Sequence, residues 1–294
     1  MSTFTTKCFG ESNSTEYRMY FFSEHGPISP FHDIPLHHDS SNTFNMVVEI
    51  PRWTNAKMEI CKEELLNPIK QDVKKGKLRY VNNVFPHKGY IWNYGALPQT
   101  YEDPAYVDPN TEAKGDNDPI DVCEIGNKII PSGSIIQVKV LGILAMIDEG
   151  TYHKISETDW KVIAINVEDP LAEKLSDIKD VEHHMPGFLD ATRDWFRNYK
   201  VPTGKPKNSF AFNEEYKDKE FALKMIAETH EQWKHLVLQR SESSGLFRQN
   251  VTHVASPYHI LHEEAKAEVA KLPPFKQGKE VGDPAVEEIH FVPA

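Results

Sequence analysis

The chain has 294 residues, of which 39% are hydrophobic and 26% charged, and its net charge is −11 with histidines neutral. This length buries enough apolar surface for folding without a disulfide or a structural metal. The acidic balance disfavours nucleic acid as a partner, and no apolar run approaches the roughly 20 residues of a bilayer crossing. The first ten residues lack a secretory pattern, and the three cysteines form no CxxC pair. We therefore expect a cytoplasmic protein with reduced thiols and no membrane partner.

Short β-rich segments dominate the first half of the chain. Residues 1–40 are polar and rich in turns, and we expect loops there, because their four histidines are too irregularly spaced for a metal site. From Phe44 onward, turn residues separate apolar runs that predict strands over 44–50, 58–61, 78–81, 90–94, 120–125, 134–147 and 160–167. Many short strands at this spacing indicate a sandwich or a closed barrel.

Helical periodicity replaces the strand pattern after Pro170. In the segment after Asn213, apolar residues recur at helical spacing and predict a buried face of Ala222, Met225, Ile226, Thr229, Trp233, Leu236 and Val237. Asn213 is a suitable cap for this helix, with Glu214 and Glu215 at its positive end. Beyond Gln239 we expect one short helix within 258–272, followed by a tail that wraps or frays.

Several familiar sites are excluded by their spacing. The sequence contains no G-x-x-x-x-G-K-[ST], G-x-G-x-x-G or G-x-S-x-G motif, which removes the best support for nucleotide and serine-hydrolase chemistry. His230 and His235 lie five residues apart, about 140° around a helix, so they do not form a zinc-protease face.

The strongest signal is the acidic segment 115–122, which reads GDNDPIDV. Asp116, Asp118 and Asp121 repel one another unless a hard cation lies among them. The alternative interpretation is a solvated turn, which Gly, Asn and Pro also favour. An EF-hand calcium loop is excluded, because three of its required positions carry the wrong residues.

Further acids stand at the edges of predicted strands, at Glu49, Glu59, Asp148 and Asp159. If these acids converge on the acidic segment, they form an all-oxygen site for Mg²⁺, with Mn²⁺ as a substitute. Lys57, Arg79 and Lys161 lie in the same elements, and residues two apart in a strand, such as Asp159 and Lys161, point to one face. Taken alone, the pair of Lys57 and Glu59 and the pair of Asp159 and Lys161 are each typical of surface ion pairs. Together they describe a site where carboxylates hold metal, and metal and cations hold phosphate.

The acidic segment also carries a resemblance. Residues 116–122 match the signature D-[SGDN]-D-[PE]-[LIVMF]-D-[LIVMGAC], and the chain resembles family I soluble inorganic pyrophosphatases of the eukaryotic type over about residues 17–236. The resemblance implies a mainly β fold with flanking helices (α+β), built on an OB-type five-stranded closed barrel with peripheral helices and extended termini. It implies one pyrophosphatase domain over 1–294, with a core over about 17–238, an N-terminal extension over 1–40 and a C-terminal tail over 239–294. A homodimer is implied by the same relatives.

The resemblance further implies Mg²⁺-dependent hydrolysis of pyrophosphate to two orthophosphates by direct attack of a metal-activated water. It assigns the metal to Asp116, Asp121, Asp148 and Asp159, with Glu59 for a further ion and Glu49 acting through water. Asp118 is implied as general base, and Lys57, Arg79 and Tyr94 as residues that both bind substrate and act in catalysis. Lys161, Tyr199 and Lys200 are the remaining implied phosphate contacts.

One segment departs from the family pattern. Residues 151–156 read as about six extra residues between Asp148 and Asp159, so Lys154 belongs to an insertion and is not the site lysine.

Two alternative functions remain open on the sequence. One is a metal-dependent hydrolase of organic phosphates or nucleotides, and the other is an OB-type binding module without catalysis.

Overall fold

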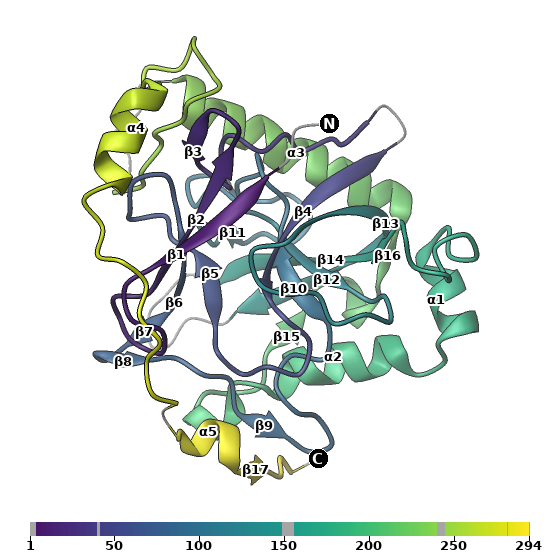
Figure 1. The fold of residues 1–294 in the computed structure, drawn as a ribbon. Helices are drawn as coiled ribbons and strands as arrows, with labels where there is room; N and C mark the ends of the chain where they lie inside the picture. The colour runs from purple at the N-terminus through teal and green to yellow at the C-terminus, as the bar shows by residue number, and fades with distance from the viewer. Residues whose placement is uncertain (1–3, 40–41, 149–155, 240–244, 281, 294) are drawn as a thin grey trace.

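The computed structural model describes residues 4–39, 42–148, 156–239, 245–280 and 282–293. Its helices are α1 (Ile178–His184), α2 (Phe188–Asn198), α3 (Lys219–Leu238), α4 (His262–Val269) and α5 (Pro284–Glu287), with 3-10 turns η1 (Val201–Thr203) and η2 (Phe212–Glu214). Its strands are β1 (Thr5–Phe9), β2 (Arg18–Ser23), β3 (Gly26–Ile28), β4 (Thr43–Ile50), β5 (Met58–Ile60), β6 (Ile69–Gln71), β7 (Val73–Lys74), β8 (Lys77–Leu78), β9 (Asn83–Val84), β10 (Asn93–Ala96), β11 (Lys114–Gly115), β12 (Asp121–Glu124), β13 (Ile135–Asp148), β14 (Glu157–Asn166), β15 (Ser209–Phe210), β16 (Lys217–Asp218) and β17 (Ile289–His290). The described chain is therefore mainly β with a few helices around it (Figure 1).

The larger sheet forms the centre of the molecule. Its strand order is β11-β14-β12-β10-β4-β13-β15, and β16 also pairs with β13. The long strand β13 pairs with β4 along its first part and with β14 along most of its length. The pairings from β4 through β10, β12, β14 and β13 therefore return to β4. Gly95 of β10 permits one of these pairings, because a Cβ there would lie 2.0 Å from the carbonyl oxygen of Val47.

Helices cover this sheet on separate faces. The first half of α3 packs Ala222, Met225 and Ile226 against apolar residues of β4, β12, β13 and β14. Trp195 and Phe196 of α2 belong to a second apolar cluster that also contains residues of β10, β13 and β14. The two clusters fix the sheet between α3 and α2 (Figure 1).

The expectation of loops over residues 1–40 is wrong for Thr5–Phe9, Arg18–Ser23 and Gly26–Ile28, which form strands, and is confirmed over 29–39. β1 and β2 pair antiparallel, and β2 also pairs with β3 and β6 in a smaller sheet. Met19, Tyr20 and Phe21 of β2 are consecutive buried residues, and they pack with Trp233 of α3. The strand gave no alternating signal because three neighbouring residues are buried together.

The other strand predictions differ in accuracy. Those over 44–50, 58–61, 120–125 and 134–147 are confirmed to within about one residue at each end. The strand expected over 160–167 begins earlier, at Glu157, and only Lys77–Leu78 forms near 78–81. The strand expected over 90–94 is shifted to Asn93–Ala96, because the backbone N–H of Tyr90 donates instead to Thr54 in a loop.

The predicted buried face of α3 is confirmed at every position. Its predicted start at Asn213 is wrong, because Lys217–Asp218 first pairs with β13 as β16. The cap is Asp218, whose side chain accepts a hydrogen bond from the backbone N–H of Phe221. Asn213 lies in η2 with a φ of 54°. Neither α3 nor any other helix in the described part of the chain combines the length and apolar character needed to cross a bilayer.

The C-terminal segment wraps around the molecule. The short helix expected within 258–272 is present as α4, and the backbone N–H of Gly10 donates to the carbonyl of Pro273. Further on, β17 pairs in parallel with β9 at the bottom of Figure 1. The side-chain amide of Asn83 donates to the carbonyls of Val286 and Glu288, at 2.9 and 3.0 Å.

A buried histidine joins the N-terminal segment to α3 and to this C-terminal segment. The indole N–H of Trp233 donates to Nδ1 of His32 at 3.0 Å, so this nitrogen carries no proton. Nε2 of His32 donates to the carbonyl of Phe247 at 3.1 Å. The neutral ring therefore satisfies both contacts, and burial lowers the pKa of His32 to about 3.

We expect the free energy of unfolding to fall as the pH drops from 6.5 toward 3. In this window the unfolded chain binds a proton at His32 that the folded chain does not, which gives a slope of about 1.4 kcal/mol per pH unit. Urea unfolding between pH 4 and pH 7 gives the free energy of unfolding at each pH. The change of this free energy with pH should be smaller for His32→Gln than for the unsubstituted chain. Replacement of the exposed His25 by Gln is the control, and equal slopes for all three proteins would contradict the prediction.

Candidate active site

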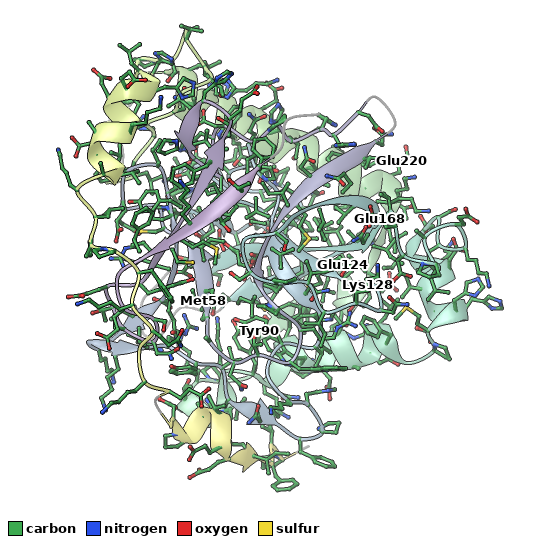
Figure 2. The ribbon with its side chains drawn as sticks, in the orientation of Figure 1. Met58, Tyr90, Glu124, Lys128, Glu168 and Glu220 are labelled. Carbon is green, nitrogen blue, oxygen red and sulfur yellow. The ribbon has the colours of Figure 1, made fainter. Side chains whose placement is uncertain are left out.

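A cleft of about 190 Å³ brings together all the side chains that the sequence singled out. Its lining includes Glu49, Lys57, Glu59, Arg79, Tyr94, Asp116, Asp118, Asp121, Asp148, Asp159, Lys161, Tyr199 and Lys200. Met58 and Tyr90, both labelled in Figure 2, also line it. The acids and cations come from strands and loops far apart in sequence, and the fold makes them neighbours.

Lys161 lies at the centre of the cleft floor. β12 and β14 run parallel, and their register places Asp121 opposite Lys161. Nζ of Lys161 lies 2.5 Å from Oδ2 of Asp121 and also forms an ion pair with Asp159, two residues earlier on the same strand face. The ammonium donates a further hydrogen bond to the hydroxyl of Tyr94 at 2.9 Å.

Because Lys161 and its two acids are poorly exposed to solvent, the charge of Lys161 depends on Asp121 and Asp159. Only 3% of the Lys161 side chain is exposed, and burial disfavours its charge, but Asp121 and Asp159 together raise its pKa well above the ordinary value. Burial, and secondarily the charge of Asp121, raise the pKa of Asp159 to about 7. The two acids therefore keep Lys161 charged in a poorly solvated place, and Lys161 in turn opposes the rise in the pKa of Asp159.

Three carboxylates converge beside Lys161. One oxygen each of Glu102, Asp116 and Asp159 lies within 4.8 Å of the other two. Burial, with mutual repulsion, raises the pKa values of Glu102 and Asp116 well above their usual range. Oε2 of Glu102 is buried and has no hydrogen-bond partner among the described residues. Hard oxygen donors in such a crowded arrangement fit a divalent cation such as Mg²⁺ or Mn²⁺.

Glu102 is the acid that the sequence did not reveal. The backbone N–H of Trp160 donates to its Oε1 at 3.1 Å, which turns the carboxylate toward β14. Its own backbone N–H donates to the carbonyl of Asp118 at 2.9 Å. It is an isolated acid in an irregular segment, so neither spacing nor periodicity distinguishes it from a surface glutamate.

The opposite side of the cleft carries cations that are each paired with an acid. Lys57 forms an ion pair with Glu59, and Nη1 of Arg79 lies 2.8 Å from Oδ2 of Asp72. Lys57 also lies 3.9 Å from Asp72, so this missed aspartate bridges the two cations.

The end of α2 contributes the last cation. Lys200 forms an ion pair with Asp148, and the ring of the neighbouring Tyr199 stacks on Trp195 with centroids 4.8 Å apart. The position just after the last turn of α2 therefore directs both residues into the cleft.

The remaining two predicted acids, Glu49 and Asp118, also line the cleft. The backbone N–H of Ile60 donates to Oε1 of Glu49 at 2.7 Å, and burial raises the pKa of Glu49 well above its usual range. The backbone N–H of Asp118 donates to Oδ1 of Asp116 at 3.0 Å, within a tight turn.

The hairpin between β13 and β14 holds the predicted insertion. Asp148 pairs directly with Glu157, and Asp159 follows two residues later. Of the insertion over 151–156, residues 151–155 lie outside the described part of the chain, and His153 and Lys154 are among them. The described ends of the hairpin still bring Asp148 and Asp159 to the same cleft.

Replacement of Lys161 by Met should destabilise the protein in the absence of divalent cations by about 3 kcal/mol. The change leaves two poorly exposed carboxylates without their shared cation. Chemical unfolding in EDTA measures the loss. Lys234→Met removes an exposed pair with Glu231 and should cost about 1 kcal/mol or less. Equal losses for the two variants would refute this account of the cluster.

Comparisons with known proteins agree with the arrangement. The family model for inorganic pyrophosphatase matches residues 46–234. The inorganic pyrophosphatase of Homo sapiens is 58% identical over 275 residues, covering 93% of each chain. That of Drosophila melanogaster is 53% identical over 99% of this chain and 85% of its own.

Solved structures extend the likeness to three dimensions. The inorganic pyrophosphatase from Schistosoma japonicum has a TM-score of 0.90 and 59% identity, over 98% of this chain and 100% of that one. A truncated vacuolar soluble pyrophosphatase from Trypanosoma cruzi, solved in complex with PPi, has a TM-score of 0.73 and 42% identity over 80% of this chain and 92% of its own. On these matches, the chain belongs to the inorganic pyrophosphatase family.

Proposed function

We propose that the protein hydrolyses inorganic pyrophosphate to two orthophosphates in the presence of Mg²⁺, by direct attack of water on phosphorus. Family membership supports the activity of an inorganic diphosphatase. The observation that carries the proposal is the composition of one cleft, in which buried and half-buried carboxylates lie among lysine, arginine and tyrosine side chains. An acidic protein can hold a polyanion there only if cations lie between its carboxylates and the ligand.

The carboxylates divide into groups by position. Asp116, Asp121 and Asp159 would hold Mg²⁺ near Lys161, with Glu102 beside them. Asp148 and Glu59 would hold metal at the edges of the cleft, and Glu49 would act through water. When bound, Mg²⁺ neutralises phosphate oxygens and lowers the pKa of coordinated water, and Mn²⁺ has similar oxygen preferences.

The cations of the cleft would bind the two phosphate groups. They come from separate elements: Lys57 just before β5, Arg79 just after β8, Tyr94 in β10, Lys161 in β14, and Tyr199 and Lys200 just after α2. Their ion pairs with acids keep them oriented before substrate binds. Pyrophosphate oxygens would then replace carboxylates as partners, and the same charges would stabilise the leaving phosphate.

Asp118 is the proposed general base. Its side chain is 41% exposed, more than that of Asp121 or Asp159, so a water molecule in the cleft has access to it. A carboxylate in this position accepts the proton that water loses as it attacks phosphorus.

Other features of the family are proposed for the chain as a whole. The returning strand pairings support an OB-type closed barrel of five strands, β4, β10, β12, β13 and β14. We further propose one pyrophosphatase domain, a homodimer and a cytoplasmic location. A mouse relative at 54% identity is named mitochondrial, so cell fractionation is the test of location. Light scattering should give twice the mass of one chain.

Phosphate release from pyrophosphate should require both a divalent cation and Asp118. We expect turnover with Mg²⁺, none with EDTA, and a loss of at least about 100-fold in kcat for Asp118→Asn, because an amide does not accept the proton. Asp190→Asn removes a carboxylate from a surface pair on α2 and is the matched control. Full activity in the Asp118 variant would remove that residue from its proposed role.

Isotopically labelled water tests the direct attack. A single turnover in the labelled solvent should place one solvent oxygen in the released phosphate, because water forms the new P–O bond as the bridging P–O bond breaks. Absence of label would contradict direct attack of water on phosphorus.

A nucleoside triphosphate as comparison substrate should be cleaved far more slowly than pyrophosphate, and equal rates would favour a broader phosphohydrolase.

A further inference from the structure

Lys62 lies directly behind the proposed general base. It follows β5 by two residues, and its side chain is 14% exposed. Nζ lies 2.5 Å from Oδ1 of Asp118 and donates a hydrogen bond to the carbonyl of Asn117 at 2.8 Å. Asp118 lines the cleft, but Lys62 is not among the lining residues. Lys62 therefore differs from Lys57, Lys161 and Lys200, which face the cleft itself.

The backbone on either side of Asp118 is already fixed. Asn117 has a φ of 71°, and its side-chain oxygen accepts a hydrogen bond from the hydroxyl of Tyr101 at 2.6 Å. The backbone N–H of Asn117 donates to the carbonyl of Glu102, and the carbonyl of Asp118 accepts from the backbone N–H of Glu102. These contacts set where the turn lies. The direction of the Asp118 carboxylate still depends on its side-chain torsions, and Lys62 holds one of the two oxygens.

Lys62 is itself held by the C-terminal segment. The backbone N–H of Phe247 donates to the carbonyl of Lys62 at 2.7 Å. The side-chain amide of Asn67 donates to the carbonyls of Phe247 and Cys61, at 3.1 and 3.2 Å. The loop that carries Lys62 is thus tied on both sides of the residue, and its ammonium is a fixed point for Asp118.

We infer that Lys62 is a positioning residue for the hydrolysis, acting through Asp118. By engaging Oδ1 from behind, it turns the second carboxylate oxygen toward the cleft, where the proton of the attacking water is accepted. The inference rests on the proposed function of Asp118. Because small displacements of a catalytic group cost about 100-fold in rate, loss of this contact lowers turnover more than substrate binding.

Steady-state kinetics with pyrophosphate and saturating Mg²⁺ test the inference. Lys62→Met should lower kcat by about 10- to 100-fold and change KM by less than about twofold. Lys62→Arg keeps the charge and the donors, and should recover kcat to within about fivefold. Lys70→Met is the matched control, because Lys70 is also a partly buried lysine, paired with Glu64 at 3.0 Å outside the cleft. It should leave both constants within about twofold.

A double substitution separates action through Asp118 from other effects. In the Asp118→Asn background, Lys62→Met should lower kcat by no more than about twofold, because the group it positions is already lost. A full additional loss there, a rise in KM at constant kcat, or an equal loss in Lys70→Met would overturn the inference. Activity retained by Asp118→Asn alone would instead refute the proposed base. If melting curves show that Lys62→Met is unfolded, Lys62→Gln carries the same tests.

Discussion

Repulsion between carboxylates in a poorly solvated cleft is the constraint on which the rest of the structure depends. Burial raises the pKa values of Asp116, Asp159 and Glu102, and repulsion from neighbouring acids raises them further, as Asp116 and Asp159 do for Glu102. The fold tolerates this cluster because the Lys161 ammonium pairs with two acids. The same carboxylates that are costly to bring together favour a small polyanion that binds with metal.

The frame that imposes this crowding is a set of strands with fixed register. β12 and β14 run parallel, so Asp121 and Lys161 meet side by side, and alternation along β14 adds Asp159 to the same face. The opposite side comes from β5 and the end of α2, which the aromatic cluster around Trp195 attaches to the sheet. A shift of one residue in β14 would turn both Asp159 and Lys161 away from the cleft.

The sequence was informative where charge or periodicity is local. The acidic segment 115–122 and the buried face of α3 were found because their residues are close in sequence, and the family resemblance supplied Tyr199 and Lys200. Glu102 and Lys62 were not found, because their partners Trp160 and Asn117 lie 58 and 55 residues away. Asp72 was not found because its contact with Arg79, seven residues away, follows no strand or helix spacing. The strand β2 was missed since its buried residues are consecutive, and Asn213 was preferred as a cap because the pairing of β16 with β13 has no local signal.

The segment just after β1 pairs with a segment made late in synthesis, which has a consequence for how the chain folds. Phe9 and Glu11, next to β1, form bridges to Pro274 and Lys276, and Phe247 holds the loop of Lys62. A ribosome makes the chain from its N-terminus, so the central strands emerge well before these last supports. A nascent chain can pair the strands of the central sheet while the segment that carries Phe247 is still in the exit tunnel. The contact between Phe247 and the loop of Lys62 is therefore added late, after the strands that carry most acids of the cleft.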